Sequence, residues 1–231
     1  MKLHRFYIPA PTELKHDFWL KDERLIHQWR KVLRFGAGQQ VVLFDGVTQD
    51  RLYKIVEITE REAHLQQVTD LERKVPSKDI YLLWSLLKKD KNDWVLQKCT
   101  ELGVSHFIPL LADRSEKTGF NSERAEKIII EATEQCGRSD IPTVREPMHI
   151  QTALDELSEK VELYICEQSD HLPPTTYHLP HAVGVLVGPE GGWSDAEKAL
   201  FQDKQIKHLN LHDFTLRAET AAIAAVTKLL Q

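Results

Sequence analysis

The residues with the clearest potential for chemistry form a glycine-rich segment, Val187-Gly-Pro-Glu-Gly-Gly192. Its three glycines let the backbone take left-handed angles and approach a ligand closely, and parallel sheets bind ligands beyond the carboxyl ends of their strands. The segment lacks the Lys-Ser/Thr pair of a Walker loop and the spacing of a GxGxxG motif. Glu190 would also disfavour an anionic phosphate. We therefore predict a site for a neutral or cationic ligand, the alternative being a tight strand-to-helix turn.

Further motifs place arginine or glutamate near the ends of predicted elements. Arg217 and Glu219 precede an alanine-rich helix, either as an N-terminal charge pair or as the rim of the same pocket. Arg114-Ser115 ends a strand, and Arg138-Ser139 follows a helix that Gly137 can cap. Arginine beside a small hydroxyl suits contacts with phosphates or bases, although loop arginines are commonly only solvated.

A basic surface is predicted on a helix near the N-terminus. Its residues recur at three- and four-residue spacings and so share one helix face: Arg24, His27, Arg30, Lys31 and Arg34. Because the net charge of the chain is -5, a nucleic-acid partner would need such a local patch rather than a global positive field. The alternative is a solvated helix face.

Other kinds of site are not expected. The 3 cysteines include no CxxC pair, and the 11 histidines show no HExxH spacing, so we predict no disulfide framework and no metal site. No apolar run approaches the ~20 residues of a membrane span. The N-terminus has no continuous apolar stretch of the signal-peptide type. The lack of a disulfide framework and of a zinc cluster makes a reducing cytoplasm the default location. Trp84, Trp94 and Trp193 are interpreted as core residues, and Trp193 could also wall a pocket.

Residues 1–70 have the pattern of a small β-barrel of short strands with one helix. The strands are expected at 5–8, 40–46, 51–59 and 62–68, and the helix at 22–34. Asp45-Gly46 is a strong hairpin signal. The charged, proline-containing stretch 71–79 lacks periodicity and is interpreted as a linker.

Residues 80–231 alternate between strand and helix patterns, which predicts an α/β domain with a largely parallel sheet. The strands are expected at 80–87, 104–110, 142–145, 161–166, 182–188 and 206–211. The helices are expected at 90–102, 122–138, 149–158 and 217–230. A further helix opens with the capping box Ser194-Asp-Ala-Glu197, and Gly103 can close the first helix as a left-handed cap.

Taken together, these motifs resemble those of a known family. In chain order they are Gln97-Lys-Cys-Thr-Glu-Leu-Gly-Val104, Ile108-Pro-Leu110, Arg114-Ser115, Glu134-Gln-Cys-Gly-Arg-Ser139, Val187-Gly-Pro-Glu-Gly-Gly192 and Leu216-Arg-Ala-Glu-Thr220, preceded by His27 and Val32-Leu-Arg34. The series resembles the bacterial 16S rRNA (uridine-N3)-methyltransferases, members of the SPOUT class, over essentially the whole chain.

The resemblance implies a fold and partners. Residues 80–231 would form a methyltransferase domain with a deep trefoil knot, and residues 1–70 would form a PUA-like barrel that binds RNA. The RNA-binding residues would be Arg24, His27, Arg30, Arg34, Arg114 and Arg138. The protein would act as a homodimer on 16S rRNA or the small ribosomal subunit.

The resemblance also implies S-adenosylmethionine as the cofactor. The residues expected to hold it are Cys166, Glu167, Leu186, Gly188, Pro189, Glu190, Gly191, Gly192, Leu209, Leu211 and Leu216, the four leucines forming an adenine slot. Glu190 suits a cationic sulfonium. We expect Glu219 to act as the general base for the uridine ring nitrogen and Arg217 to stabilise the uridine anion.

The chain departs from the family pattern in the last loop of the site. Leu211-His212 replaces the usual Leu-Gly, Phe214 replaces a commonly basic residue, and Ala218 replaces a threonine. Two other functions are considered. One is a SPOUT methyltransferase that acts on another RNA site, such as a ribose 2'-hydroxyl, and the other is a non-catalytic RNA-binding assembly factor.

Overall fold

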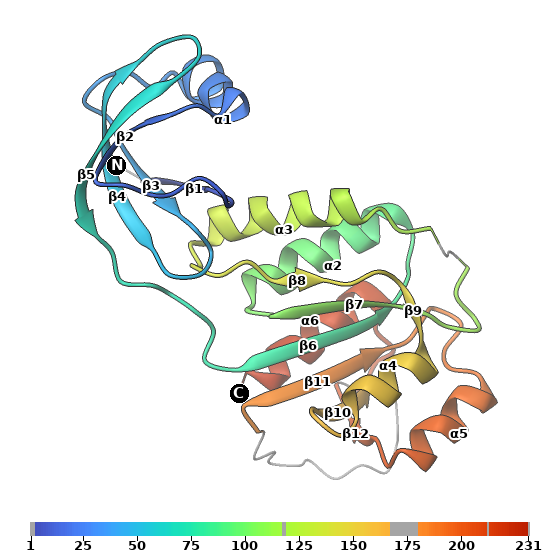
Figure 1. Ribbon diagram of the computed structural model, residues 1–231. Helices are drawn as coiled ribbons and strands as arrows, with labels where there is room; N and C mark the ends of the chain where they lie inside the picture. Colours follow the sequence, from blue (N-terminus) through green and yellow to red (C-terminus); the bar gives the residue numbers. More distant parts are fainter. Residues whose placement is uncertain (1–2, 117–118, 167–179, 212, 231) are drawn as a thin grey trace. The chain divides into compact units, whose positions relative to one another are not determined.

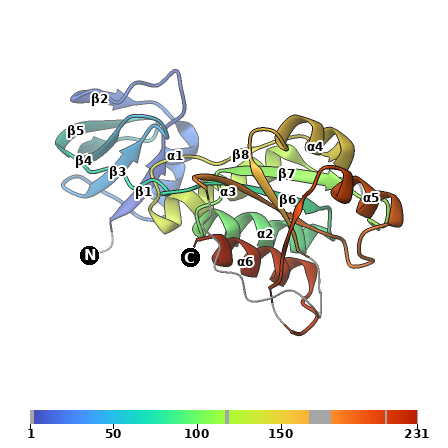
Figure 2. The same ribbon diagram turned by 90° about the horizontal axis from the view of Figure 1, so that it is seen from below.

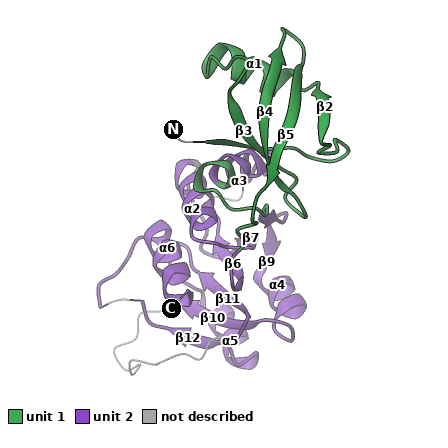
Figure 3. Cartoon of the chain, turned by 90° about the vertical axis from the view of Figure 1, so that its left-hand side faces the viewer, with its two compact units in different colours: residues 1–75, 133–141 green, residues 76–132, 142–231 purple. Residues whose placement is uncertain are grey.

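The computed structural model describes residues 3–116, 119–166, 180–211 and 213–230 (Figure 1). The chain divides into two compact units, which Figure 3 shows in different colours. Unit 1 comprises residues 1–75 and 133–141, and unit 2 comprises residues 76–132 and 142–231. The chain therefore passes between the units after residues 75, 132 and 141, and the first of these passages falls within the expected linker at 71–79.

Unit 1 is built on a five-stranded sheet in the order β1-β3-β4-β5-β2. Its strands are β1 (His4–Tyr7), β2 (Asp17–Leu20), β3 (Gln40–Phe44), β4 (Asp50–Ile58) and β5 (Ala63–Asp70). Neighbouring strands are antiparallel except β1 and β3, which are parallel. The strands expected from the sequence are confirmed. β2 was not predicted, because only one of its 4 residues is buried and no alternation is visible.

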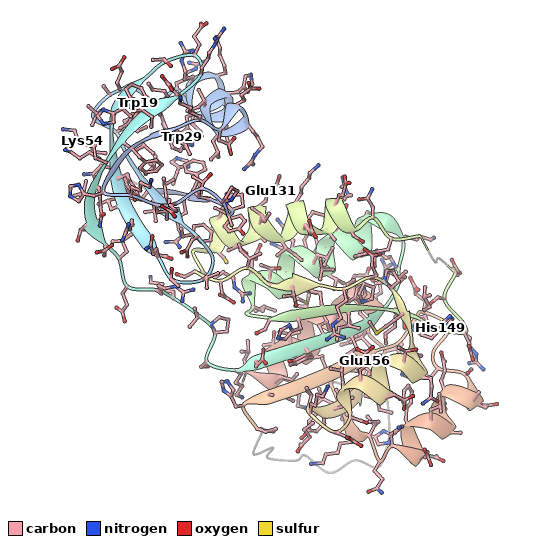
Figure 4. All side chains as sticks on the ribbon, in the orientation of Figure 1. Trp19, Trp29, Lys54, Glu131, His149 and Glu156 are labelled. Carbon is pink, nitrogen blue, oxygen red and sulfur yellow. The ribbon has the colours of Figure 1, made fainter. Side chains whose placement is uncertain are left out.

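The expected helix at 22–34 is confirmed, but it ends in an unusual way. Asp22 caps α1 (Glu23–His27) by accepting a hydrogen bond from the Leu25 backbone N–H at 2.9 Å. The chain continues as a π-helical turn, η1 (Gln28–Val32), whose Trp29 packs into the core of the unit (Figure 4). Arg34 then takes a left-handed conformation with φ 56°, where glycine is usual after a helix. The helix therefore ends on an exposed arginine with a strained backbone.

One carboxylate organises the hairpin between β3 and β4. Asp45 accepts hydrogen bonds from the backbone N–H groups of Val47, Thr48 and Gln49 at 2.7–2.9 Å. Partial burial opposes ionisation, but these hydrogen bonds outweigh it and lower the pKa of Asp45 to about 2. Gly46 follows with a left-handed φ of 79°, so the predicted Asp45-Gly46 turn is confirmed.

Residues 133–141, which include the last turn of α3 (Ser122–Cys136), belong to unit 1. The buried Asp50 carboxylate accepts hydrogen bonds from the Arg5 guanidinium at 2.6 Å and from the Ser139 hydroxyl at 2.7 Å. A segment far along the sequence thus completes the polar interior of unit 1.

Unit 2 contains a parallel sheet in the order β12-β10-β11-β6-β7-β8, with β9 also paired to β7. Its strands are β6 (Asp79–Ser85), β7 (His106–Leu111), β8 (Thr143–Val144), β9 (Met148–His149), β10 (Glu162–Cys166), β11 (Ala182–Val187) and β12 (Lys207–Leu209). The expected alternation is confirmed, and only the 2-residue β9 was not predicted. β6 and β11 are neighbours, but the chain leads from β6 to β7 on one side and from β11 to β12 on the other. Their boundary is therefore a topological switch point, where α/β folds bind ligands.

Helices cover both faces of this sheet. α2 (Lys89–Glu101) and α6 (Ala218–Leu229) lie on one face, and α4 (Ile150–Leu157) and α5 (Asp195–Asp203) lie on the other (Figure 2). Gly103 closes α2 with a φ of 100°, as predicted. No described helix is long and apolar enough to cross a membrane.

The three tryptophans assigned to the core do not behave alike. Trp84 and Trp193 are 1% and 4% exposed, as expected. Trp94 is 51% exposed, so its assignment to the core is wrong. The next two positions of α2, Val95 and Leu96, are the buried ones, and the indole of Trp94 instead lies on the surface beneath the Lys98 ammonium, 5.4 Å from the ring centre.

Candidate functional site

Neighbouring strands of unit 2 bring residues expected to hold the cofactor to one edge of the sheet. Cys166, the last residue of β10, pairs in register with Leu209, the last residue of β12. Ile165 pairs in register with Leu186 of β11. The loops that follow β11 and β12 therefore leave the same edge of the sheet, on the two sides of β10. Glu167, which was also expected here, lies outside the described residues.

The leucines expected to line an adenine slot differ in exposure. Leu186 and Leu209 are fully buried within their strands. Leu211 and Leu216 are partly exposed in the segment between β12 and α6. His212, in the same segment, lies outside the described residues. The pair of partly exposed leucines therefore offers apolar surface to a ligand, whereas the buried pair supports the edge from within.

The glycines of the loop at 188–192 have different structural roles. A β-carbon on Gly188 would lie 3.0 Å from Cε2 of Trp193, and one on Gly191 would lie 3.2 Å from Cβ of Arg114. Only Gly192 has a left-handed φ, of 68°. The left-handed angles expected for these glycines are therefore confirmed for Gly192 alone. At positions 188 and 191 glycine is needed for another reason, because neighbouring side chains leave little room for a β-carbon.

The loop continues into α5 through the predicted capping box. The Glu197 backbone N–H donates to Ser194 Oγ at 3.2 Å, and the Ser194 backbone N–H donates to the Glu197 carboxylate at 2.6 Å. The buried Glu197 carboxylate also accepts from the Asp113 backbone N–H at 2.8 Å. The Arg114 guanidinium donates to the Gly191 carbonyl at 3.2 Å. The glycine loop is thus fixed to the residues that follow β7.

A lysine that the sequence analysis did not single out joins two glutamates of the site. The Lys91 ammonium lies 3.1 Å from Glu190 Oε1 and 3.4 Å from Glu219 Oε2. Its hydrogen bond to Glu190 and the attraction of Glu219 raise the pKa of Lys91. Burial opposes ionisation of Glu190, but a backbone hydrogen bond and Lys91 keep the pKa of that carboxyl below its ordinary value. One cation and two acidic side chains therefore connect α2, the glycine loop and the first turn of α6.

The two predicted catalytic residues lie at the start of α6. Arg217 is the N-cap residue, and its exposed side chain makes no capping hydrogen bond. The Glu219 side chain is 16% exposed, and its Oε2 is buried beside Lys91 without a hydrogen bond from any described residue. Ala218, between them, is buried, whereas Phe214 in the preceding loop is 73% exposed. The structure therefore brings Glu219 to Glu190 and leaves the side chain of Arg217 on the surface.

The residues of the predicted basic surface lie on the helix of unit 1, except Arg34, which follows its end. Arg24, His27 and Arg34 are exposed. The Arg30 side chain is 30% exposed and forms an ion pair of 3.7 Å with Glu60. An exposed pair of this length contributes little to stability, so Arg30 can exchange Glu60 for a phosphate at low cost.

The two predicted RNA-binding arginines outside that surface have different surroundings. Arg114 is exposed in unit 2. Arg138 is 7% exposed, and its guanidinium donates to the Asp140 carboxylate at 2.5 and 3.0 Å. Arg138 therefore offers little guanidinium surface to a partner, and its role in RNA binding stays a prediction.

Two of the cysteines, Cys99 and Cys166, offer no second reactive centre. Burial raises the pKa of the Cys99 and Cys166 thiols, which therefore behave as small hydrophobic side chains. No cluster of three or more potential metal ligands occurs in the described part of the chain.

Comparison with known proteins identifies the class. The family model described as RNA methyltransferase domain matches residues 73–230, and the one described as RNA methyltransferase PUA domain matches residues 30–68. The chain belongs to the RNA methyltransferase family. Among its relatives is the ribosomal RNA small subunit methyltransferase E of Aquifex aeolicus, 31% identical over 81% of this chain and 84% of the relative. The family resemblance seen in the motifs is therefore confirmed.

Solved structures share the fold of the whole chain. The ribosomal RNA small subunit methyltransferase E of Neisseria gonorrhoeae, solved with bound S-adenosyl methionine, is 26% identical with a TM-score of 0.87. A methyltransferase of Legionella pneumophila, solved with the cofactor SAM, is 29% identical with the same TM-score of 0.87. Each alignment covers 99% of this chain and 97% of the other.

Proposed function

We propose that this protein transfers a methyl group from S-adenosylmethionine to ring nitrogen 3 of a uridine in 16S rRNA. The observation that carries the proposal is the meeting of Glu190, in the glycine loop, with Glu219, in the first turn of α6, where the parallel strands end. Relatives that align with most of the chain are named ribosomal RNA small subunit methyltransferase E, and one was solved with S-adenosyl methionine, which supports the substrate class and the cofactor.

The residues at this edge suit a cationic cofactor. Glu190 and Glu219 place two carboxylates at this edge of the sheet, which can attract a sulfonium. Asn210 Oδ1 is a buried acceptor and Trp193 Nε1 a buried donor, and neither forms a hydrogen bond with a described residue. Adenosine carries donors and acceptors that can satisfy such atoms. The loop at 188–192, with Leu211 and Leu216, would hold the cofactor, which supplies an electrophilic methyl group.

The chemistry requires a base and a stabilised anion. The proton on uridine N3 must leave before that nitrogen can act as a nucleophile. Glu219 is the proposed acceptor of this proton, because its carboxylate lies at the site and its Oε2 is engaged there only by the 3.4 Å ion pair with Lys91 among the described residues. Arg217, two residues earlier, is the proposed cation that stabilises the resulting uridine anion.

Exposed and partly exposed basic residues of unit 1 are the proposed RNA contacts. Arg24, His27, Arg30 and Arg34 would bind phosphates, which position the RNA without reading its sequence. The family resemblance further leads us to propose a homodimer that acts in the cytoplasm, with a trefoil knot in unit 2.

Primer extension on 16S rRNA tests the reaction. A methyl group on nitrogen 3 blocks the pairing edge of uridine, so reverse transcription should stop at one uridine after treatment with the protein and S-adenosylmethionine. A ribose 2'-O-methyl group leaves that edge free, and an assembly factor would transfer no methyl group at all. Transfer of labelled methyl without the uridine stop would therefore exclude the base as the target.

Two substitutions test the assigned roles. Glu219→Gln should retain binding of S-adenosylmethionine but lose roughly 10²–10⁴-fold in rate, the usual range for loss of a general base. Arg217→Ala should also lower the rate, and higher pH should partly restore it by ionising uridine in solution. Glu156→Gln, which removes a surface carboxylate paired with Arg145 at 2.6 Å, is the matched control (Figure 4). Full activity in both site variants would show that these residues only stabilise the start of α6.

A further inference from the structure

The sequence predicted no role for Lys91. Its ammonium lies between carboxylates from two other elements, Glu190 at 3.1 Å and Glu219 at 3.4 Å. The Lys91 side chain is 23% exposed and the Glu219 side chain 16% exposed, so water screens this pair less than it screens the contact of Lys91 with Glu190, whose side chain is 41% exposed. Without the cation, the two carboxylates would repel each other across the site.

The main chain beside Lys91 is rigidly held. Asn92, the next residue, is 6% exposed. Its Oδ1 accepts hydrogen bonds from the Trp84 indole at 2.9 Å and the Leu87 backbone N–H at 3.1 Å, and its Nδ2 donates to the Leu87 carbonyl at 2.8 Å. These bonds fix the start of α2 to the end of β6. The ammonium of Lys91 is therefore carried on a backbone that is already positioned relative to the sheet.

We propose that Lys91 is a positioning residue of the methyl-transfer site, which holds Glu190 and Glu219 at a fixed separation so that Glu219 meets the uridine. The inference rests on the proposed function, because it assigns to Lys91 a task within that reaction. Lys91 acts through the two carboxylates rather than on the RNA. Its loss should therefore slow the chemical step more than it weakens the binding of either substrate.

Steady-state kinetics test this positioning role. Lys91→Met should lower kcat by about 10–10²-fold, since a displacement of about 1 Å at a reacting group has effects of this size. The KM values for RNA and S-adenosylmethionine should change by only a few-fold. Lys91→Arg, which can still join two carboxylates, should restore most of kcat. Lys204→Met removes a lysine of similar exposure, 29%, which pairs with Asp155 at 2.7 Å, and is the matched control.

A double-mutant cycle tests the bridge without any methyl transfer. Thermal unfolding of Lys91→Met, Glu219→Gln and the double variant should show that Lys91→Met is less destabilising when residue 219 is already neutral. The fall in melting temperature caused by Lys91→Met should be about 2–4 °C smaller in the Glu219→Gln protein than in the wild type. Additive effects would overturn the bridge itself.

The two experiments separate the possible failures. Coupled unfolding with a kcat of Lys91→Met near that of the wild type would overturn the positioning role. A raised KM for RNA at unchanged kcat would also overturn it, because Lys91 would then be an RNA contact. Coupled unfolding in a wild-type protein that methylates no RNA would leave the bridge in place and refute the proposed function.

Discussion

Replacing Gly188 by alanine is expected to destabilise unit 2 through Trp193. The added β-carbon would lie 3.0, 3.3 and 3.4 Å from three atoms of the indole. Trp193 is 4% exposed and packs edge-to-face on Phe201 with 5.0 Å between ring centres, so the indole has little room to move away. Overpacking of this kind costs about 1–3 kcal/mol. At about 2–4 °C per kcal/mol for a chain of this size, the melting temperature should fall by roughly 2–12 °C.

Thermal unfolding and calorimetric titration with S-adenosylmethionine measure this effect. Gly192→Ala is the comparison variant, because its β-carbon would meet nothing within 4 Å and the cost there is left-handed strain alone, about 1–2 kcal/mol. Gly188→Ala should lose more cofactor affinity than Gly192→Ala, since it displaces the indole that packs against the loop. A Gly188→Ala protein with the melting temperature and affinity of the wild type would refute this account of the loop.

Three further predictions concern separate parts of the chain. Arg34→Gly relieves the left-handed strain and should raise the unfolding free energy by about 1 kcal/mol, while equilibrium titration with an rRNA fragment should show weaker binding and a shallower salt dependence. Because the pKa of Asp45, about 2, lies below its unfolded value, the hairpin carboxylate stabilises the fold above pH ~4 and loses this effect as the pH falls towards 2. Urea unfolding measures this effect as the fall in unfolding free energy between pH ~4 and pH ~2. Since Asp45 is largely solvated, this fall should be at most about 1 kcal/mol larger for the wild type than for Asp45→Asn. Gly191→Val should abolish calorimetric binding of S-adenosylmethionine, because its side chain would meet Arg114.

Features that depend on neighbouring residues could be predicted from the sequence. The Ser194–Glu197 capping box, the Asp45-Gly46 turn and the Gly103 helix end were predicted because the residues that interact lie within a few positions of one another. The alternation of strands and helices in unit 2 was equally visible, since buried parallel strands are continuous apolar runs.

Features that depend on distant residues could not be predicted. Lys91 belongs to the charged run Lys88-Lys-Asp-Lys91, which is typical of a solvated helix start, and its partner Glu190 is 99 residues away. Trp94 was wrongly assigned to the core for a related reason. A large apolar residue in a helix does not by itself reveal which face of the helix packs against the rest of the protein. The meeting of Glu190 with Glu219 was considered only as one alternative, since the register of β10, β11 and β12 is a property of the folded sheet.

The assignment of residues 133–141 to unit 1 limits how this protein can be dissected. A fragment that ends in the segment 71–79 would keep Asp50 but lose Ser139, which donates to its carboxylate at 2.7 Å. Such a fragment would leave part of a buried charge unsatisfied, a defect that costs about 1–3 kcal/mol or more. Unit 1 is therefore not a self-sufficient module that gene fusion could transplant by cutting the chain once. Supplying a peptide of residues 133–141 in trans should restore what the cut removes.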